Sequence, residues 1–388
     1  MRSAVLDSCA SSLLSAAAVR ERSRNIADAV IAGQSRHFGV DRARLDEAAS
    51  LVARVTRERY PDLAIPYHSR WRHFEAGGVD RRALLPDDPH AHVDLTVVSV
   101  LLDAGAGPGW SYFEEATGKR FTRSEGLGVA SFRAFAEGAF SAGADPFRVD
   151  AERLADIDEA TLGALFEVRD DNPLVGLGGR AALLRRLGEA LDGGRPSGLY
   201  HRLTAQSRSV SVTAILRELL DMLGPIWLTG STLDGIALGD AWQHPHASGD
   251  GPTRGWVPFH KLSQWMTYSM LEPFEWAGAT LTDQDALTGL PEYRNGGLLL
   301  DTGVIVWRDP ADATVAWDVG SELVVEWRAL TVSLIDELAP RVRTLLATPD
   351  LPLACILEGG TWAAGRALAA EKRNGNPPFA VNSDGTVF

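Results

Sequence analysis

The chain has 388 residues, of which 45% are hydrophobic and 23% charged, and its formal net charge is −13. This composition is typical of a globular protein with one large domain or two lobes. The acidic balance argues against nucleic acid as a partner, because phosphate backbones are bound by basic surfaces. No apolar run in the sequence approaches the roughly 20 residues needed to cross a bilayer, so we expect no membrane partner either.

The N-terminal segment is predicted to belong to the fold. Its first 19 residues contain Arg2 and a Leu/Ala-rich patch, as a signal peptide does, but Asp7 and several serines interrupt the patch. Residues 16–31 continue as a charged amphipathic helix, which a cleaved segment would not. The two cysteines, Cys9 and Cys355, lie far apart and form no motif, which favours a cytoplasmic, reducing location.

A helix is predicted over residues 41–60, where Pro61 ends it. Its apolar stripe consists of Leu45, Ala48, Ala49, Val52 and Val55. The next stretch, residues 66–74, is dense in His, Arg and aromatic side chains. We interpret it as a loop that either faces a site or forms a surface cluster, with equal weight on the two.

Residues 93–102 form an almost wholly apolar run, which predicts a buried helix or strand. Asp103 follows it beside three glycines, and a carboxylate there is costly unless it is paired or used. Trp110 and Tyr112 come next as candidate substrate-binding residues. A metal site at His90, His92 and Asp94 is an alternative, but no further ligand at a known spacing follows. Hydrogen-bonded histidines are therefore the favoured interpretation, and we predict no metal.

Further helices are predicted at 124–140, 156–166, 177–191, 209–223, 318–346 and 361–373. Residues 228–258 are rich in Gly and Pro and predict a long loop or lid, with Asp240, His244 and His246 as a second metal alternative. Helices dominate and strands never alternate with them regularly, so the fold class is mainly α. We expect one helical domain over 1–388, or two lobes at 1–225 and 226–388.

The stretch from Trp256 to Trp307 carries the clearest functional signal. A helix is predicted after Pro258, and one of its faces combines a cation, an amide and two aromatic rings: Lys261, Gln264, Trp265 and Tyr268. Such a face is typical of a pocket wall for a polar ligand, although the two rings could equally be core with the lysine reaching past them to water. Glu292, Tyr293 and Arg294 then precede Gly296-Gly297, and Asp301 follows.

Three segments, Ser69 to Phe74, His90 to Tyr112 and Val257 to Asp301, resemble a family of unknown-function proteins from the uracil-catabolism pathway of fungi and bacteria. The resemblance covers nearly the whole chain. It implies a pathway that opens the uracil ring through a nucleotide and passes through a ribosylurea.

A more distant set of motifs is similar to the hydrolases that release the base from queuosine 5′-phosphate. The motif residues are Phe259, Lys261, Gln264, Glu292, Tyr293, Arg294, Leu299, Gly320, Glu322, Glu326 and Arg328. This similarity implies a helical fold related to DNA glycosylases, with Glu292 in the carboxylate role and Lys261 near an anion. The chain departs from that pattern by having Glu where those hydrolases have Asp.

Together the two resemblances predict a hydrolase that cleaves the N-glycosidic bond of a ribosyl or phosphoribosyl urea, without a cofactor. A fixed carboxylate would stabilise the oxocarbenium-like sugar, with Glu292 as first candidate and Asp301 or Asp103 as second. Lys261 and Arg294 would hold a phosphate if the substrate has one. The remaining substrate-binding candidates are Trp110, Tyr112, His260, Gln264, Trp265, Tyr268 and Tyr293. A metal-dependent amidohydrolase acting on a ureido compound and a non-catalytic binding or scaffold protein remain the alternatives.

Overall fold

A computed structural model describes residues 9–382 of the chain. The contacts between residues divide the chain into two units. Within the described residues, unit 1 comprises 9–68, Ser231–Gln264 and 283–382, and unit 2 comprises Ser69–Gly230 and Trp265–Thr282. Residues 9–68 thus group with the C-terminal part of the chain. Met1 to Ser8, which carry part of the predicted N-terminal segment, lie outside the described residues.

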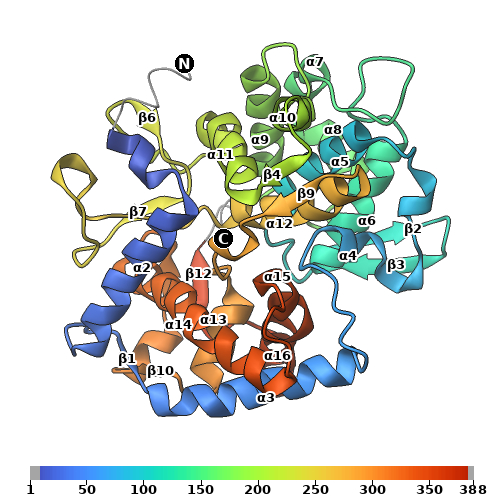
Figure 1. The fold of residues 1–388 in the computed structure, drawn as a ribbon. Helices are drawn as coiled ribbons and strands as arrows, with labels where there is room; N and C mark the ends of the chain where they lie inside the picture. The colour runs from blue at the N-terminus through green and yellow to red at the C-terminus, as the bar shows by residue number, and fades with distance from the viewer. Residues whose placement is uncertain (1–8, 383–388) are drawn as a thin grey trace. The chain divides into compact units, whose positions relative to one another are not determined.

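Unit 1 is built around the long helix α14 (Glu322–Leu346), whose side chains are buried along most of its length. It packs against α2 (Ala16–Ile31) and α3 (Leu45–Arg59), while α13 (Tyr293–Asp301) packs against α16 (Trp362–Arg373) (Figure 1). The predicted apolar stripe of α3 is buried as expected, because residues spaced three and four apart share one helix face. Helix α15 (Leu353–Ile356) is joined to α16 by a π-helical stretch, Leu357–Thr361.

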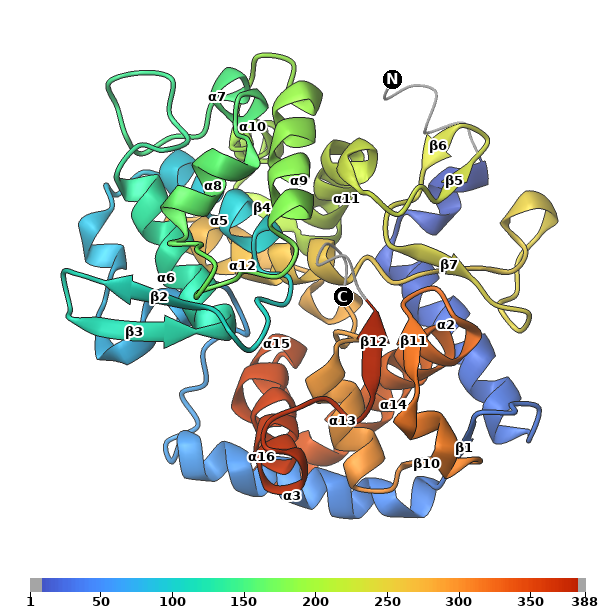
Figure 2. The same ribbon diagram turned by 180° about the vertical axis from the view of Figure 1, so that it is seen from behind.

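The strands of unit 1 are short, and within residues 9–382 they form four two-stranded pairs. Strand β1 (Phe38–Val40) is antiparallel to β10 (Ile305–Trp307), and β11 (Ala316–Asp318) is parallel to β12 (Ala380–Asn382), as Figure 2 shows for the second pair. The segment predicted as a loop or lid forms two hairpins: β5 (Thr232–Leu233) with β6 (Ile236–Ala237), and β7 (Ala241–Gln243) with β8 (Trp256–Pro258). The C-terminal tail supplies β12.

Unit 2 is also mainly helical. Its helices are α4 (Trp71–Phe74), α5 (Pro89–Leu101), α6 (Arg123–Ala136), α7 (Ala151–Ala155), α8 (Glu159–Leu165), α9 (Leu177–Ala190), α10 (Gly198–Thr204) and α11 (Val212–Leu223). A hairpin joins β2 (Ser111–Glu114) to β3 (Lys119–Thr122), and β4 (Ser209–Ser211) runs parallel to β9 (Thr280–Thr282). Helix α12 (Lys261–Trp276) starts in unit 1 and continues in unit 2.

The mainly α prediction is confirmed, and the predicted helices form close to their expected bounds. The segment 66–74 differs from the expected loop or surface cluster, because it contains α4 and buries Arg70, Trp71, His73 and Phe74. Its aromatic rings supply core contacts, and the buried charge of Arg70 is paired with Asp103. None of the helices within residues 9–382 combines the length and apolar character needed to cross a bilayer.

Candidate functional site

A buried ion pair in unit 1 joins Arg328, one of the motif residues named above, to Asp240. Arg328 of α14 donates from Nη1 to Asp240 Oδ1 at 2.8 Å and from Nη2 to Asp240 Oδ2 at 2.7 Å. Both side chains are almost completely buried. Burial alone would raise the pKa of Asp240, but the charge and hydrogen bonds of Arg328 outweigh it and lower that pKa. The pair is therefore a fixed, ionised, two-pronged contact.

This ion pair sets the start of α12. The backbone N–H of Lys261 donates to Asp240 Oδ2 at 3.0 Å, and the N–H groups of Phe259 and His260 donate to the Asp240 carbonyl. The Arg328 guanidinium also lies 4.2 Å from the centroid of the Phe259 ring. The direction in which the chain enters α12 is consequently held at Asp240 and Arg328.

His260 occupies a backbone conformation that side chains rarely adopt, with φ of 47°. Its ring is buried, and Nε2 lies 2.9 Å from the Leu13 carbonyl oxygen. Burial lowers the pKa of His260, so the ring is neutral near pH 7 and its Nε2–H donates to that carbonyl. The predicted substrate-binding residue is thus held by the N-terminal segment.

The same ion pair also touches the start of α13. Arg328 Nε donates to the Pro291 carbonyl at 3.4 Å, one residue before Glu292. Glu292 is the N-cap of α13: Oε2 accepts from the Arg294 backbone N–H at 2.8 Å, and Oε1 from the Asn295 backbone N–H at 2.7 Å. These bonds and the positive end of the helix hold the carboxylate in one orientation. The structure therefore brings the Phe259, Glu292 and Arg328 motifs to one ion pair.

Inside unit 1, the Gln264 side chain joins the start of α12 to the segment before Glu292. Its side-chain nitrogen donates to the Phe259 carbonyl at 3.1 Å and to Thr288 Oγ1 at 2.9 Å, and its oxygen accepts from the Thr288 backbone N–H at 3.0 Å. Both ends of the amide are occupied by protein groups. This geometry gives Gln264 a role in positioning the segment before Glu292.

Asp301 is not brought together with Glu292. Glu292 caps the first turn of α13 and Asp301 is its last residue, nine positions later, so the two lie roughly 13 Å apart along the helix axis. Paired glycosidase carboxylates lie closer, at roughly 5–9.5 Å. Arg373 engages both Asp301 oxygens, at 2.7 and 2.6 Å. Asp301 lines a surface hollow of about 480 Å³ that Glu292 does not line. The two-pronged contact between Asp301 and Arg373 is typical of a structural ion pair.

In unit 2, the candidate Asp103 pairs with the fully buried Arg70. Arg70 also donates to Ser99 Oγ at 2.7 Å and to the Ser124 carbonyl at 3.1 Å, and its Nη1 lies 2.9 Å from His73 Nδ1. Its guanidinium lies 5.7 Å from the Trp265 ring centroid. The carboxylate that sequence reasoning singled out is thus paired, and its catalytic role stays a prediction.

The aromatic candidates of unit 2 differ in their surroundings. Trp110 is buried and donates from Nε1 to the Phe166 carbonyl at 2.8 Å, while Tyr268 is buried on α12. Tyr112 on β2 is half-buried, and burial together with the charges of Glu137 and Glu167 raises its pKa to about 12. Tyr112 is therefore a neutral hydrogen-bonding group at any physiological pH.

The residues of the two metal alternatives have other partners. His92 packs between the Trp71 and Trp276 rings, each 5.5 Å away, and Asp94 accepts from Arg195 at 2.6 Å and from the backbone of Val149 and Ser197. In the second set, Asp240 pairs with Arg328, and His244 Nε2 lies 3.6 Å from Glu326 Oε2. Within residues 9–382, no three His, Cys, Asp or Glu side chains are grouped as metal ligands.

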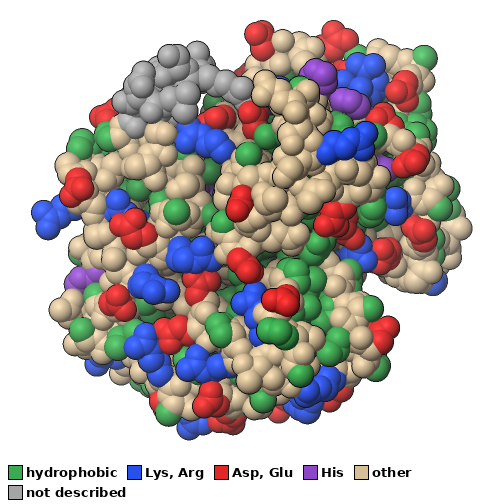
Figure 3. All heavy atoms as spheres, viewed as in Figure 1, with side chains coloured by type: hydrophobic (Ala, Val, Ile, Leu, Met, Phe, Trp, Pro, Cys, Tyr) green, Lys and Arg blue, Asp and Glu red, His purple; other side chains and the backbone are tan. Residues whose placement is uncertain are grey.

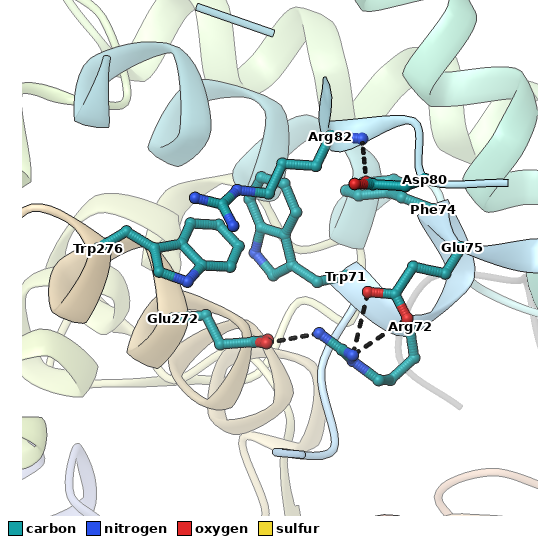
Figure 4. Close-up of a pocket in the computed structure, with 8 residues that line it drawn as sticks. All are labelled: Trp71, Arg72, Phe74, Glu75, Asp80, Arg82, Glu272 and Trp276. Atoms are coloured by element: carbon teal, nitrogen blue, oxygen red, sulfur yellow. Dashed lines mark hydrogen bonds and ion pairs between the residues drawn. The ribbon is translucent and has the colours of Figure 1, made fainter. Parts of the chain in front are cut away.

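A cavity of about 220 Å³ opens in unit 2 (Figure 4). Trp71 and Trp276 meet edge to face with centroids 4.7 Å apart, and the Arg82 guanidinium stacks 3.5 Å from the Trp276 centroid. On the opposite side Arg72 bridges Glu272 and Glu75. The cavity is bordered by two basic side chains, Arg72 and Arg82, and by three acidic ones, Glu75, Asp80 and Glu272. None of the predicted site residues lines it. Likewise, acidic and basic side chains are interspersed on the face shown in Figure 3.

Sequence reasoning missed Trp362 and underestimated Asp240, which it considered as a metal ligand only. The Arg294 guanidinium lies 4.8 Å from the Trp362 ring centroid and 5.0 Å from that of Tyr293. Trp362 follows the sequence Glu358-Gly-Gly-Thr. A carboxylate and an aromatic ring beside paired glycines are the same signal that drew attention to Glu292 and Gly296-Gly297, so this signal was available.

Comparison with known proteins places the chain in a family. It is 38% identical to "Protein urg3" of Schizosaccharomyces pombe, in an alignment that covers 97% of this chain and 98% of the relative. It is 37% identical to "Uracil catabolism protein 4" of Lachancea kluyveri, over 99% of this chain and all of the relative. These similarities confirm the resemblance inferred from the three sequence segments. With a family model matching residues 12–388, the chain belongs to the family described as proteins of unknown function (DUF1688).

Proposed function

We propose that this protein acts in uracil catabolism as a hydrolase that cleaves the N-glycosidic bond of a ribosyl or phosphoribosyl urea. The pathway rests on the relative named as a uracil catabolism protein, which the chain matches along its whole length. The reaction type rests on the motif similarity to the queuosine 5′-phosphate hydrolases. One observation carries the proposal: the Glu292 carboxylate is held by two backbone N–H groups, in a segment tied to the ion pair that also positions Lys261.

In the proposed reaction the bond between the sugar C1 and the urea nitrogen breaks, and the electron pair leaves with the nitrogen. The sugar then carries positive charge at C1, which the ionised Glu292 stabilises. Water adds its oxygen to C1 and passes one of its protons to Glu292, which gives that proton to the departing urea nitrogen and becomes ionised again. A carboxylate fixed before the reaction stabilises this charge without the cost of reorganising at the transition state.

The test incubates the purified full chain with ribosylurea, its 5-phosphate, uridine and uridine monophosphate, and measures released urea or base by mass spectrometry. We expect urea from at least one ribosyl urea. In Glu292→Gln the rate should fall about 10²–10³-fold, the usual effect of losing one preorganised electrostatic group. Asp158→Asn is the matched control, because Asp158 also caps a helix by accepting from the Thr161 backbone N–H but lies outside the motifs.

The control should keep the parental rate. Turnover by Glu292→Gln at the parental rate would falsify the assignment of the carboxylate. Tight binding of a ribosyl urea without any turnover would instead support the alternative of a non-catalytic binding protein in the same pathway.

A further inference from the structure

Trp362 in unit 1 collects several cationic or ionisable groups around one indole ring. The guanidinium of Arg294 lies 4.8 Å from its centroid, that of Arg366 lies 5.4 Å away, and the ring of His68 lies 5.9 Å away. Trp362 is half-buried and Arg366 is exposed, so the cluster extends from the interior to the surface. We refer to Arg294, Arg366 and Trp362 as the Trp362 cluster.

Arg294 is the unusual member of the cluster. Its side chain is buried, yet within the described residues its guanidinium takes part in no hydrogen bond or ion pair, and Nη1 is completely shielded. Two aromatic rings flank it, but rings replace only part of the hydration that a buried cation loses. By contrast, the buried Arg81 pairs with Glu114, and the buried Arg180 donates to the Leu102 carbonyl.

The carboxylate on the neighbouring π-helical stretch does not serve Arg294. Glu358 Oε1 accepts from Arg59 at 3.0 Å, and Oε2 lies 2.8 Å from His68 Nδ1. Glu292, which is closer in sequence, directs both oxygens to backbone N–H groups. Among residues 9–382, no carboxylate or other acceptor pairs with the Arg294 guanidinium, so its positive charge is available for a ligand.

We propose that the Trp362 cluster binds a phosphate group, and that the substrate of the proposed glycosidase is therefore the phosphoribosyl compound. The planar fork of an arginine matches two oxygens of a phosphate, and a second arginine suits its double negative charge. The buried Arg294 would supply most of the affinity and the exposed Arg366 a smaller part. This inference rests on the proposed function for the identity of the substrate, but the phosphate site can be tested without turnover.

Isothermal titration calorimetry of the purified full chain with inorganic phosphate, ribose 5-phosphate and ribose tests the site. We expect both phosphates to bind and ribose not to. Arg294→Gln should weaken phosphate binding about 10- to 100-fold, because a charge-assisted hydrogen bond is lost. Arg366→Gln should weaken it a few-fold and, being an exposed change, should fold normally. Arg54→Gln is the control, because exposed Arg54 pairs with Glu58 four residues away, and it should bind like the parent.

The idea is overturned if the parent binds neither phosphate, or if folded Arg294→Gln and Arg366→Gln bind phosphate as tightly as the parent. If Arg294→Gln does not fold, Arg294→Lys, which keeps the charge but loses the fork, should bind with reduced affinity. Phosphate binding without release of urea from any compound would support the phosphate site and contradict the proposed glycosidase activity. Equal kcat/KM values for ribosylurea and its 5-phosphate would support the glycosidase activity and contradict the phosphate site.

Discussion

Asp240 and Arg328 show how much can depend on two side chains. Each is almost fully buried, and two parallel hydrogen bonds join the guanidinium to the carboxylate. Asp240 additionally accepts from the Lys261 backbone and from Trp242 Nε1 at 2.8 Å. Removing one charge would therefore leave the other buried without its partner and would release the start of α12.

We predict that Asp240→Asn lowers the free energy of unfolding by about 3–5 kcal/mol, the usual cost of breaking a buried ion pair from one side. Asp46→Asn is the control. Its carboxylate accepts from Arg341 at 3.0 Å but is largely exposed, so its loss should cost less than about 1 kcal/mol. Urea unfolding followed by circular dichroism measures both. Equal losses in the two variants would contradict the structural role given to Asp240.

At the scale of the element, α13 contains two neighbouring glycines, one tightly packed against another helix and one with free space beside it. A Cβ added to Gly296 would lie 2.5–2.7 Å from ring atoms of Trp327, whereas one added to Gly297 would find its nearest neighbour, Pro378, at 3.6 Å. Gly296 thus lets α13 approach α14 closely. Gly297 leaves room for a side chain.

We predict that Gly296→Ala lowers the free energy of unfolding by about 1–3 kcal/mol through overpacking. Gly297→Ala should be neutral or should stabilise by up to about 1 kcal/mol, because alanine is the better helix former. Thermal unfolding of the two variants side by side gives the comparison. A Gly296→Ala protein as stable as Gly297→Ala would show that Trp327 yields without cost.

The helices were predictable because their signals are local. The stripe of α3, the cap at Ser15 and the proline that opens α5 all lie within a few residues of the element they specify. The short helix α4 was not predicted, since it takes its burial from rings that are remote in sequence, such as Trp276. The strand β12 was missed for the same reason: its partner β11 lies more than 60 residues earlier.

At the scale of the whole molecule, each unit holds a buried carboxylate with a strongly depressed pKa. Burial alone would raise the pKa of Glu114 in unit 2, but hydrogen bonds from Arg81, Thr117 and Arg133 lower it to about 2. In unit 1, burial acts in the same sense on Glu358, and the hydrogen bond and charge of His68 together with Arg59 lower its pKa to about 2.

Acid should therefore destabilise the protein in a defined range. A carboxylate with a depressed folded-state pKa contributes its full stability above its ordinary value of 4.5 and loses it as the pH falls toward 2. Each of these groups accounts for at most roughly 3 kcal/mol. We predict that the free energy of unfolding falls between pH 4.5 and pH 2.5, and that Glu114→Gln shows a smaller fall. Urea titrations at several pH values test this, and parallel profiles would contradict it.

The candidate site was predictable in part. Local spacing identified Lys261, Glu292 and Arg294 as unusual, and the motif order linked them to Arg328. The sequence could not reveal that Asp301 would lie at the far end of α13 from Glu292, because the paired glycines between them do not predict a continuous helix. Nor could it place Trp362 beside Arg294, a contact between residues 68 positions apart that depends on how α13 packs on α16.

The π-helical stretch Leu357–Thr361 has a geometric consequence for that contact. A π-turn accommodates one residue more than an α-turn, so every later side chain is rotated by about 100° relative to an uninterrupted α-helix. Glu358 can thus turn toward Arg59 and His68 while Trp362 reaches Arg294. The angular offset between the carboxylate and the indole is set by this single additional residue.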